Sequence, residues 1–151
     1  MSRSNAAVLA ASAASPSEVR MAQVSSVDRA PTDTNGSRIT IRRDGEPDLQ
    51  IERGYLLLTV ETTPRGSSPS LSNKRWKVYR LYGTRRVWDP VMGDFDRLVV
   101  AEEGHSSMKG EKVRYTAHVC SDAVEAWTAM GKLDELKEPF AELGLPVVQK
   151  I

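Results

Sequence analysis

Residues 112–130, KVRYTAHVCSDAVEAWTAM, contain the change of hydrophobic period that decides the fold class. Up to Cys120 apolar and polar residues alternate, which is typical of a half-buried β-strand. From Asp122 the sequence has the signals of a helix. Asp122 and Glu125 have the spacing of a capping box, which marks a helix start, and Gly131 is a typical helix end. The stretch therefore predicts a strand that is followed directly by a helix.

Upstream of this stretch, the sequence predicts a series of consecutive strands. The expected strands cover residues 38–43, 49–52, 55–62, 75–82, 86–88, 95–101 and 112–120. Short turns separate several of them, and the turn residues 44–47 (DGEP) predict a hairpin, with a break at Arg53-Gly54. Consecutive strands with short connections form antiparallel sheets.

Downstream, apolar residues recur at helical spacing from Leu133 to Leu143, and Pro139 interrupts them. We expect a kink there, or two short helices. Residues 145–151 are expected to form a closing edge strand. The whole pattern predicts one α+β domain over residues 38–151, with an antiparallel sheet of about six or seven strands covered by C-terminal helices.

The first 37 residues have a composition that predicts a disordered leader. They contain no Trp, Tyr, Phe or Ile and are rich in Ala and Ser, so they offer little apolar surface to bury. Residues 1–20 also leave open a secretory signal, an organelle transit peptide, or a true start at Met21. No apolar run reaches 18 residues, so we expect a soluble, cytoplasmic protein without a membrane partner.

The formal net charge of +1 conceals an uneven distribution along the chain. Residues 62–88 hold seven basic and no acidic residues (+7). Residues 1–61 hold seven basic and eight acidic residues (−1), and residues 89–151 hold seven basic and twelve acidic residues (−5). The near-neutral total excludes a uniformly basic nucleic-acid wrapper, but it leaves a basic middle segment as a candidate interaction region.

This basic segment also contains four aromatic residues, which makes it the predicted binding surface. The candidate binding residues are Arg75, Trp76, Lys77, Tyr79, Arg80, Arg85, Arg86 and Trp88. The leading hypothesis is a small non-catalytic binding or accessory protein whose partner is an acidic protein surface or a second copy of the chain. Single-stranded nucleic-acid binding is the alternative, since cations contact phosphates and aromatic rings stack on bases. A third interpretation is that the cations pair internally with acidic neighbours such as Glu102 and Glu103.

Few residues are candidates for catalysis. A small enzyme could use the single cysteine, Cys120, with His118 or His105, because Cys–His pairs form nucleophiles. One cysteine and two histidines leave little material for a metal site, and we expect no metal and no cofactor. The glycine-bounded segment 104–110 could hold a phosphate or carboxylate through backbone N–H groups, or could be an ordinary connecting loop.

Overall fold

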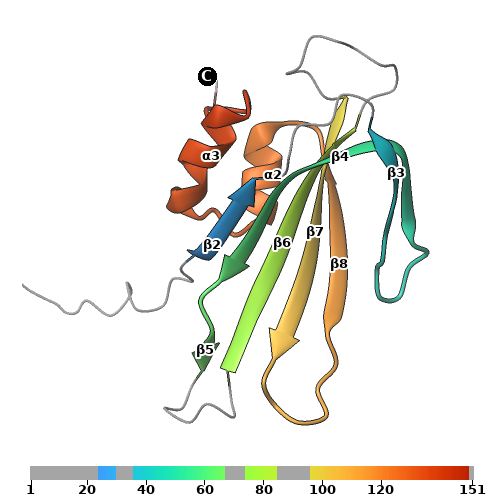
Figure 1. The fold of residues 1–151 in the computed structure, drawn as a ribbon, viewed down its shortest axis with the longest axis vertical. Coiled ribbons are helices and arrows are strands. Elements are labelled where there is room, and N and C mark those ends of the chain that lie inside the picture. The colour runs from blue at the N-terminus through green and yellow to red at the C-terminus, as the bar shows by residue number, and fades with distance from the viewer. Residues whose placement is uncertain (1–23, 30–35, 67–73, 85–95, 150–151) are drawn as a thin grey trace, which may run out of the picture.

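The computed structural model describes residues 24–29, 36–66, 74–84 and 96–149 of the 151-residue chain. Within these ranges an antiparallel sheet of seven strands packs against short C-terminal helices (Figure 1), which confirms the predicted α+β architecture. The strands are β2 (Val24–Arg29), β3 (Ser37–Ile41), β4 (Leu49–Thr62), β5 (Arg65–Gly66), β6 (Lys74–Thr84), β7 (Arg97–Ser106) and β8 (Arg114–Cys120). The helical segments are α2 (Ala123–Ala129), the 3-10 helix η3 (Asp134–Leu136) and α3 (Lys137–Glu142).

Strand β4 organises the sheet because its two halves have different neighbours. The sheet order is β2-β4-β6-β7-β8, while β3 pairs only with the first half of β4 and β5 pairs with β6. Gly54 lies where the β3 pairing ends, and the predicted break there is instead part of a continuous strand. A Cβ on Gly54 would lie 2.7 Å from Ile39 Cδ1, so any other residue here would require the end of the Ile39 side chain to move.

The sheet buries an apolar core on each of its faces. The larger core lies between the sheet and the helices, and its fully buried side chains are Leu58, Val60, Leu81, Val100, Met130, Leu136 and Phe140. The smaller core lies under the β3–β4 hairpin on the opposite face and contains Ile41, Ile51, Val99 and Ala101. Each large apolar side chain in these cores contributes about 1.5–3 kcal/mol by leaving water.

The tip of the β3–β4 hairpin reaches the outer edge of β8. Asp44 N donates to Tyr115 O at 3.0 Å, and Tyr115 N donates to Asp44 Oδ2 at 2.9 Å. The Arg42 guanidinium also lies 4.4 Å from the centre of the Tyr115 ring. These contacts occupy polar groups that an exposed strand edge would otherwise offer to another chain.

The C-terminal helices follow the signals that the sequence carries. Asp122 Oδ1 accepts from Glu125 N at 2.8 Å, while the Glu125 carboxylate accepts from Ser121 N at 2.8 Å, so the capping box is displaced by one residue. The second helical region consists of two short segments, as predicted, and Pro139 lies in the first turn of α3, where a missing N–H costs little.

Three expectations about the boundaries change. The leader predicted over residues 1–37 includes β2, which pairs with β4 and packs Val24 and Val27 against the larger core. Residues 145–149 form no strand, although Leu145 and Val147 still pack on that core. Strand β7 continues to Ser106, so the predicted 104–110 loop begins inside a strand. Residues 1–23 and the expected strand at 86–88 lie outside the described residues.

Candidate functional site

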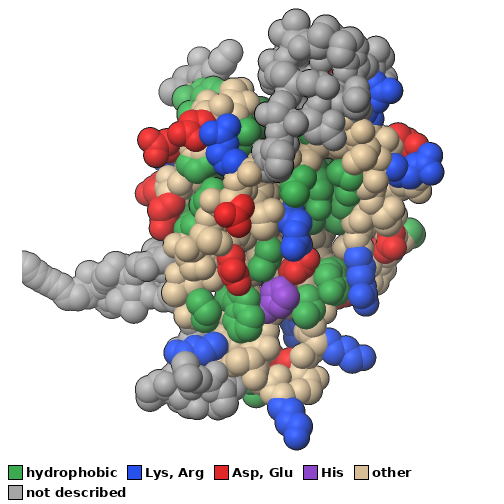
Figure 2. Space-filling model, viewed as in Figure 1, with side chains coloured by type: hydrophobic (Ala, Val, Ile, Leu, Met, Phe, Trp, Pro, Cys, Tyr) green, Lys and Arg blue, Asp and Glu red, His purple; other side chains and the backbone are tan. Residues whose placement is uncertain are grey.

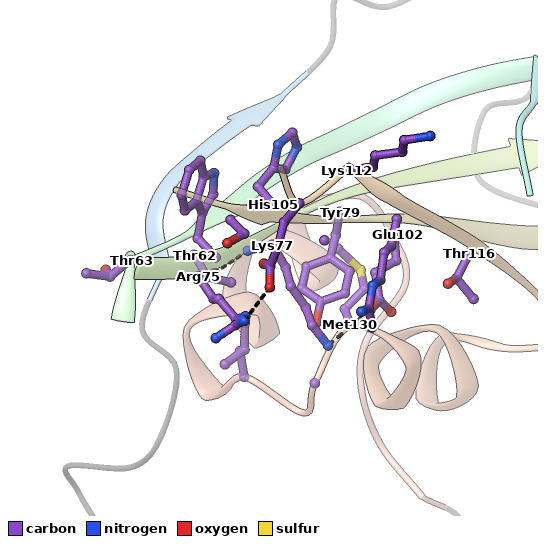
Figure 3. Close-up of a pocket in the computed structure, with 17 residues that line it drawn as sticks. Thr62, Thr63, Arg75, Lys77, Tyr79, Glu102, His105, Lys112, Thr116 and Met130 are labelled. Carbon is purple, nitrogen blue, oxygen red and sulfur yellow. Dashed lines mark hydrogen bonds and ion pairs between the residues drawn. The ribbon is translucent and has the colours of Figure 1, made fainter. Parts of the chain in front are cut away.

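A cleft of about 840 Å³ opens where the helices stop covering the sheet, near the β7–β8 connection (Figure 3). Its wall on the helix side consists of Met130, Gly131 and Leu133, which follow α2 directly. Its floor is the face of β6, β7 and β8 that points toward the helices. The cleft therefore combines an apolar wall with a polar floor.

The register of the strands arranges the floor in three rows. The rows are Arg75–Ser106, Lys77–Gly104–Arg114 and Tyr79–Glu102–Thr116. Residues directly opposite each other on neighbouring antiparallel strands point to the same face, so the side chains within a row are neighbours. The middle row has a cation at each end and no side chain at its centre.

Ion pairs connect most of the cations to carboxylates. Lys77 Nζ lies 3.0 Å from Glu102 Oε2, and the other oxygen of Glu102 lies 3.6 Å from His118 Nε2. At the edge of the cleft, Arg75 Nη2 lies 2.8 Å from Glu111 Oε2. On the opposite face of the sheet, Arg80 pairs with Glu103. These three cations of the basic segment thus meet the β7 acids Glu102 and Glu103 or, for Arg75, Glu111 in the β7–β8 connection. Figure 2 shows acidic and basic side chains interspersed on the face in view.

The protonation states of the floor residues follow from this arrangement. The hydrogen bond to Glu102 raises the pKa of Lys77 above its usual value, although burial acts in the opposite direction. Burial raises the pKa of Tyr79, and the nearby charge of Lys77 only partly opposes this. At neutral pH the floor therefore presents a charged ammonium and a protonated phenol.

The predicted binding residues do not form one surface. Arg75, Lys77 and Tyr79 face the cleft. Trp76 and Arg80 belong to the opposite face of the sheet by alternation along β6, although Trp76 and its neighbour His105 also line part of the cleft. Arg85, Arg86 and Trp88 lie outside the described residues.

The aromatic rings on the opposite face already have partners. Trp76 stacks on His105 with 5.5 Å between the ring centres and 9° between the planes, and Figure 3 shows His105 pointing away from Tyr79 and Met130. The ring of Tyr115 carries the Arg42 guanidinium. Nucleic-acid binding stays a prediction, and these contacts reduce the ring surface on which a base could stack.

The candidate catalytic residues are not brought together. Cys120 is 4% exposed, and its Sγ donates to the backbone carbonyl of His118 at 3.7 Å. Burial, with smaller effects of Glu125 and Asp122, raises the pKa of the thiol to about 11. The rings of His118 and His105 instead contact Glu102 and Glu103 on opposite faces of the sheet. This arrangement lacks the thiol–imidazole contact that a Cys–His nucleophile needs.

Among the residues that the structure describes, no group of three or more His, Cys, Asp or Glu side chains is placed to hold a metal ion. Across the same part of the chain, no helix is long and apolar enough to cross a membrane.

Comparison with known proteins adds no family to this description. No protein-family model, curated protein or solved structure matches the chain. Its function must therefore be inferred from the cleft itself.

Sequence reasoning did not assign several cleft residues to a site, among them Arg114, Thr116 and the turn residues after α2. The predicted alternation correctly places Arg114 and Thr116 on one face, whereas Lys112 lies before β8, which begins at Arg114. Their position opposite Lys77 and Tyr79 depends on the pairing of β6, β7 and β8, which no local pattern specifies.

Proposed function

We propose that this protein is a non-catalytic binding protein whose partner presents a negatively charged group to the cleft. The observation that carries the proposal is the charge of the cleft lining. Four cations line it, namely Arg75, Lys77, Lys112 and Arg114. Two carboxylates line it as well, Glu102 and Glu111, so the lining has a net charge of +2.

Both carboxylates are already engaged by other cations, which concentrates the excess charge on β8 and the residues just before it. Glu111 pairs with Arg75 and Glu102 with Lys77, whereas Lys112 and Arg114 make no ion pair with another described residue. Their side chains are exposed and available to a partner. Positive charge in a concave surface attracts anions more strongly than the same charge on a flat surface.

The size and lining of the cleft also support binding. Small-molecule sites commonly enclose about 300–1,000 Å³ and combine apolar walls with a few converging polar groups. Here charged and hydroxyl-bearing side chains line the floor, and the almost fully buried Met130 and Leu133 lie behind the wall on the helix side. The buried thiol of Cys120 and its raised pKa favour a binding role over a nucleophilic one.

A charge-reversal experiment tests the proposal. The double variant Lys112→Glu/Arg114→Glu changes the cleft, and Arg38→Glu/Arg97→Glu makes the same charge change on exposed strand residues outside it. Calorimetry with citrate and anisotropy with a labelled hexa-aspartate peptide would be measured at about 50 mM salt, where electrostatic contacts are strong.

We expect the parent protein to bind at least one of these two probes. The cleft variant should then weaken the affinity by about tenfold or more, and the control variant should change it by less than about twofold. The proposal is overturned if the parent protein binds neither probe, or if both double variants weaken binding equally.

A further inference from the structure

We infer that the cleft holds the phosphoryl group of a small phosphomonoester over Gly104, between the side chains of Lys77 and Arg114. This inference rests on the proposed binding function and names the chemical class of its ligand. It is argued from the glycine, from the two cations beside it, and from the charge of the surrounding residues.

Gly104 occupies the centre of the middle row of the floor. Any other residue at this position would place a side chain there. Its backbone does not require glycine, because it is absent from the described glycines with positive φ. A Cβ built on it would meet only Arg114 Cβ, at 3.8 Å, which is an ordinary contact. A glycine inside a strand costs stability and often marks a place where a ligand approaches the backbone closely.

The two cations are placed to converge on this gap. Lys77 and Arg114 lie on the strands on either side of Gly104, so their Cα atoms are about 10 Å apart, or two strand spacings. Both side chains are long enough to bring their charged ends over the glycine from opposite sides, and Lys77 would do so by turning from Glu102, whose Oε2 lies 3.0 Å from its Nζ. An ammonium and a guanidinium fork together suit a tetrahedral oxyanion, which offers several acceptor oxygens in different directions.

The charge of the lining matches a doubly charged group better than a singly charged one. The cleft has an excess of two positive charges, and a phosphomonoester carries about −1.5 to −2 at neutral pH. The nearest carboxylate on β7 is that of Glu102, one row away, and its two oxygens face Lys77 and His118. Hydroxyl groups complete the surroundings, with Ser106 on one side of the row and Thr116 on the other.

The rest of the ligand would lie against the wall that follows α2. The Tyr79 hydroxyl and Gly131 meet there, since a Cβ on Gly131 would lie 3.5 Å from Tyr79 Oη. Met130 and Leu133 lie behind this part of the wall, and because they are 0% and 3% exposed they belong to the core more than to the surface that a ligand touches. A cleft of about 840 Å³ accommodates a small organic group at this position.

A graded series of substitutions at Gly104 tests the inference. Gly104→Ala and Gly104→Val fill the gap in steps, and neither disturbs a charge. Thermal unfolding should show a Tm equal to or above that of the parent protein, because both residues have a higher strand propensity than glycine. Calorimetric titrations would use phenyl phosphate, inorganic phosphate and benzoate, which has the same ring but a single negative charge.

We expect phenyl phosphate to bind the parent protein about tenfold or more tightly than benzoate. Gly104→Ala should weaken its binding, and Gly104→Val should weaken it about tenfold or more. If benzoate binds as tightly as phenyl phosphate and Gly104→Val weakens both, the phosphoryl assignment is overturned while the anion-binding cleft stands. If Gly104→Val leaves phenyl phosphate binding unchanged, the position over Gly104 is wrong.

If neither phosphate compound binds the parent protein, the inference fails as a whole. The citrate and hexa-aspartate experiment then decides separately whether the cleft binds another kind of anion. A failure of the phosphoryl assignment can therefore be distinguished from a failure of anion binding in the cleft.

Discussion

Replacing Glu102 by Gln should strengthen anion binding in the cleft while it weakens the fold. Glu102 is the carboxylate that pairs with Lys77 at 3.0 Å and with His118 at 3.6 Å. Its removal frees the Lys77 ammonium for a ligand and raises the charge of the cleft lining from +2 to +3. Most substitutions in a binding site weaken binding, so an increase is a distinctive result.

The expected size of the increase follows from strand geometry. Glu102 and Gly104 are two residues apart on β7, which places the carboxylate about 7 Å from an anion over Gly104. At that distance each unit of negative charge on the ligand is repelled by about 0.6 kcal/mol in water and by about 2.4 kcal/mol at the effective dielectric constant of a protein surface. Because a phosphomonoester carries a charge of up to about −2, removing Glu102 should increase the affinity for phenyl phosphate by about sevenfold or more.

The same substitution removes a partner from two basic side chains, so the free energy of unfolding should fall by about 1 kcal/mol. Glu103→Gln is the matched control, because Glu103 is the next residue on β7 and points to the opposite face, where it contacts Arg80 and His105. It makes the same change in net charge without entering the cleft.

Calorimetry with phenyl phosphate and urea denaturation would be performed on both variants. The account requires tighter binding in Glu102→Gln, little change in Glu103→Gln, and lower stability in both. If both variants bind phenyl phosphate equally tightly, the effect comes from net charge and the cleft assignment is refuted. Unchanged affinity in Glu102→Gln would equally contradict it.

Further predictions concern the fold and the titratable groups. Phe140→Ala removes a fully buried side chain from the helix-side core and should lower the free energy of unfolding by about 3–5 kcal/mol in urea denaturation. Asp122→Ala removes the N-cap of α2, and the same assay should show a loss of about 1 kcal/mol. Burial opposes ionisation of Glu103, but hydrogen bonds from His105 and Arg80 prevail and lower its pKa below the ordinary 4.5. The stabilising effect of Glu103 is therefore present at neutral pH and is lost as the pH falls through the lowered pKa, so the parent protein and Glu103→Gln should converge in stability in acid. Cys120, with a pKa of about 11 against an ordinary 9.0, should react with iodoacetamide at pH 8 roughly 100-fold more slowly in the folded protein than in urea; comparable rates would show that its thiol is accessible.

The sequence predicts those parts of the fold that local patterns encode. The change of period at residues 112–130, the hairpin turn and the cap at Asp122 each specify a local structure that is present in the fold. The leader boundary fails because β2 has little apolar content of its own, and its pairing with β4 cannot be seen in its composition. A glycine is also an ambiguous signal in a sequence. Glycine often breaks a strand, which is why a break is predicted at Gly54, but this residue lies inside a continuous strand.

The site is harder to predict because it depends on long-range register. Alternation along a strand already places Lys77 and Tyr79 on one face and Trp76 and Arg80 on the other. A single binding surface made of all four residues is therefore incompatible with a strand. What alternation cannot supply is the neighbour across the strand, and the acids Glu102 and Glu103 meet the basic residues of β6 only through that pairing. The charge distribution along the sequence identifies the basic residues of β6. The lining of the cleft also includes Arg114 from β8 and the turn after α2, which that distribution does not identify.

The most direct test of the central claim is an amide-resolved NMR titration of the parent protein with phenyl phosphate. The account predicts that the largest shifts occur at Gly104 and at the neighbouring Lys77 and Arg114, and that they saturate with a single affinity. Shifts concentrated on the opposite face around Ile41, Ile51 and Val99, which do not line the cleft, or no saturable shifts at all, would contradict it.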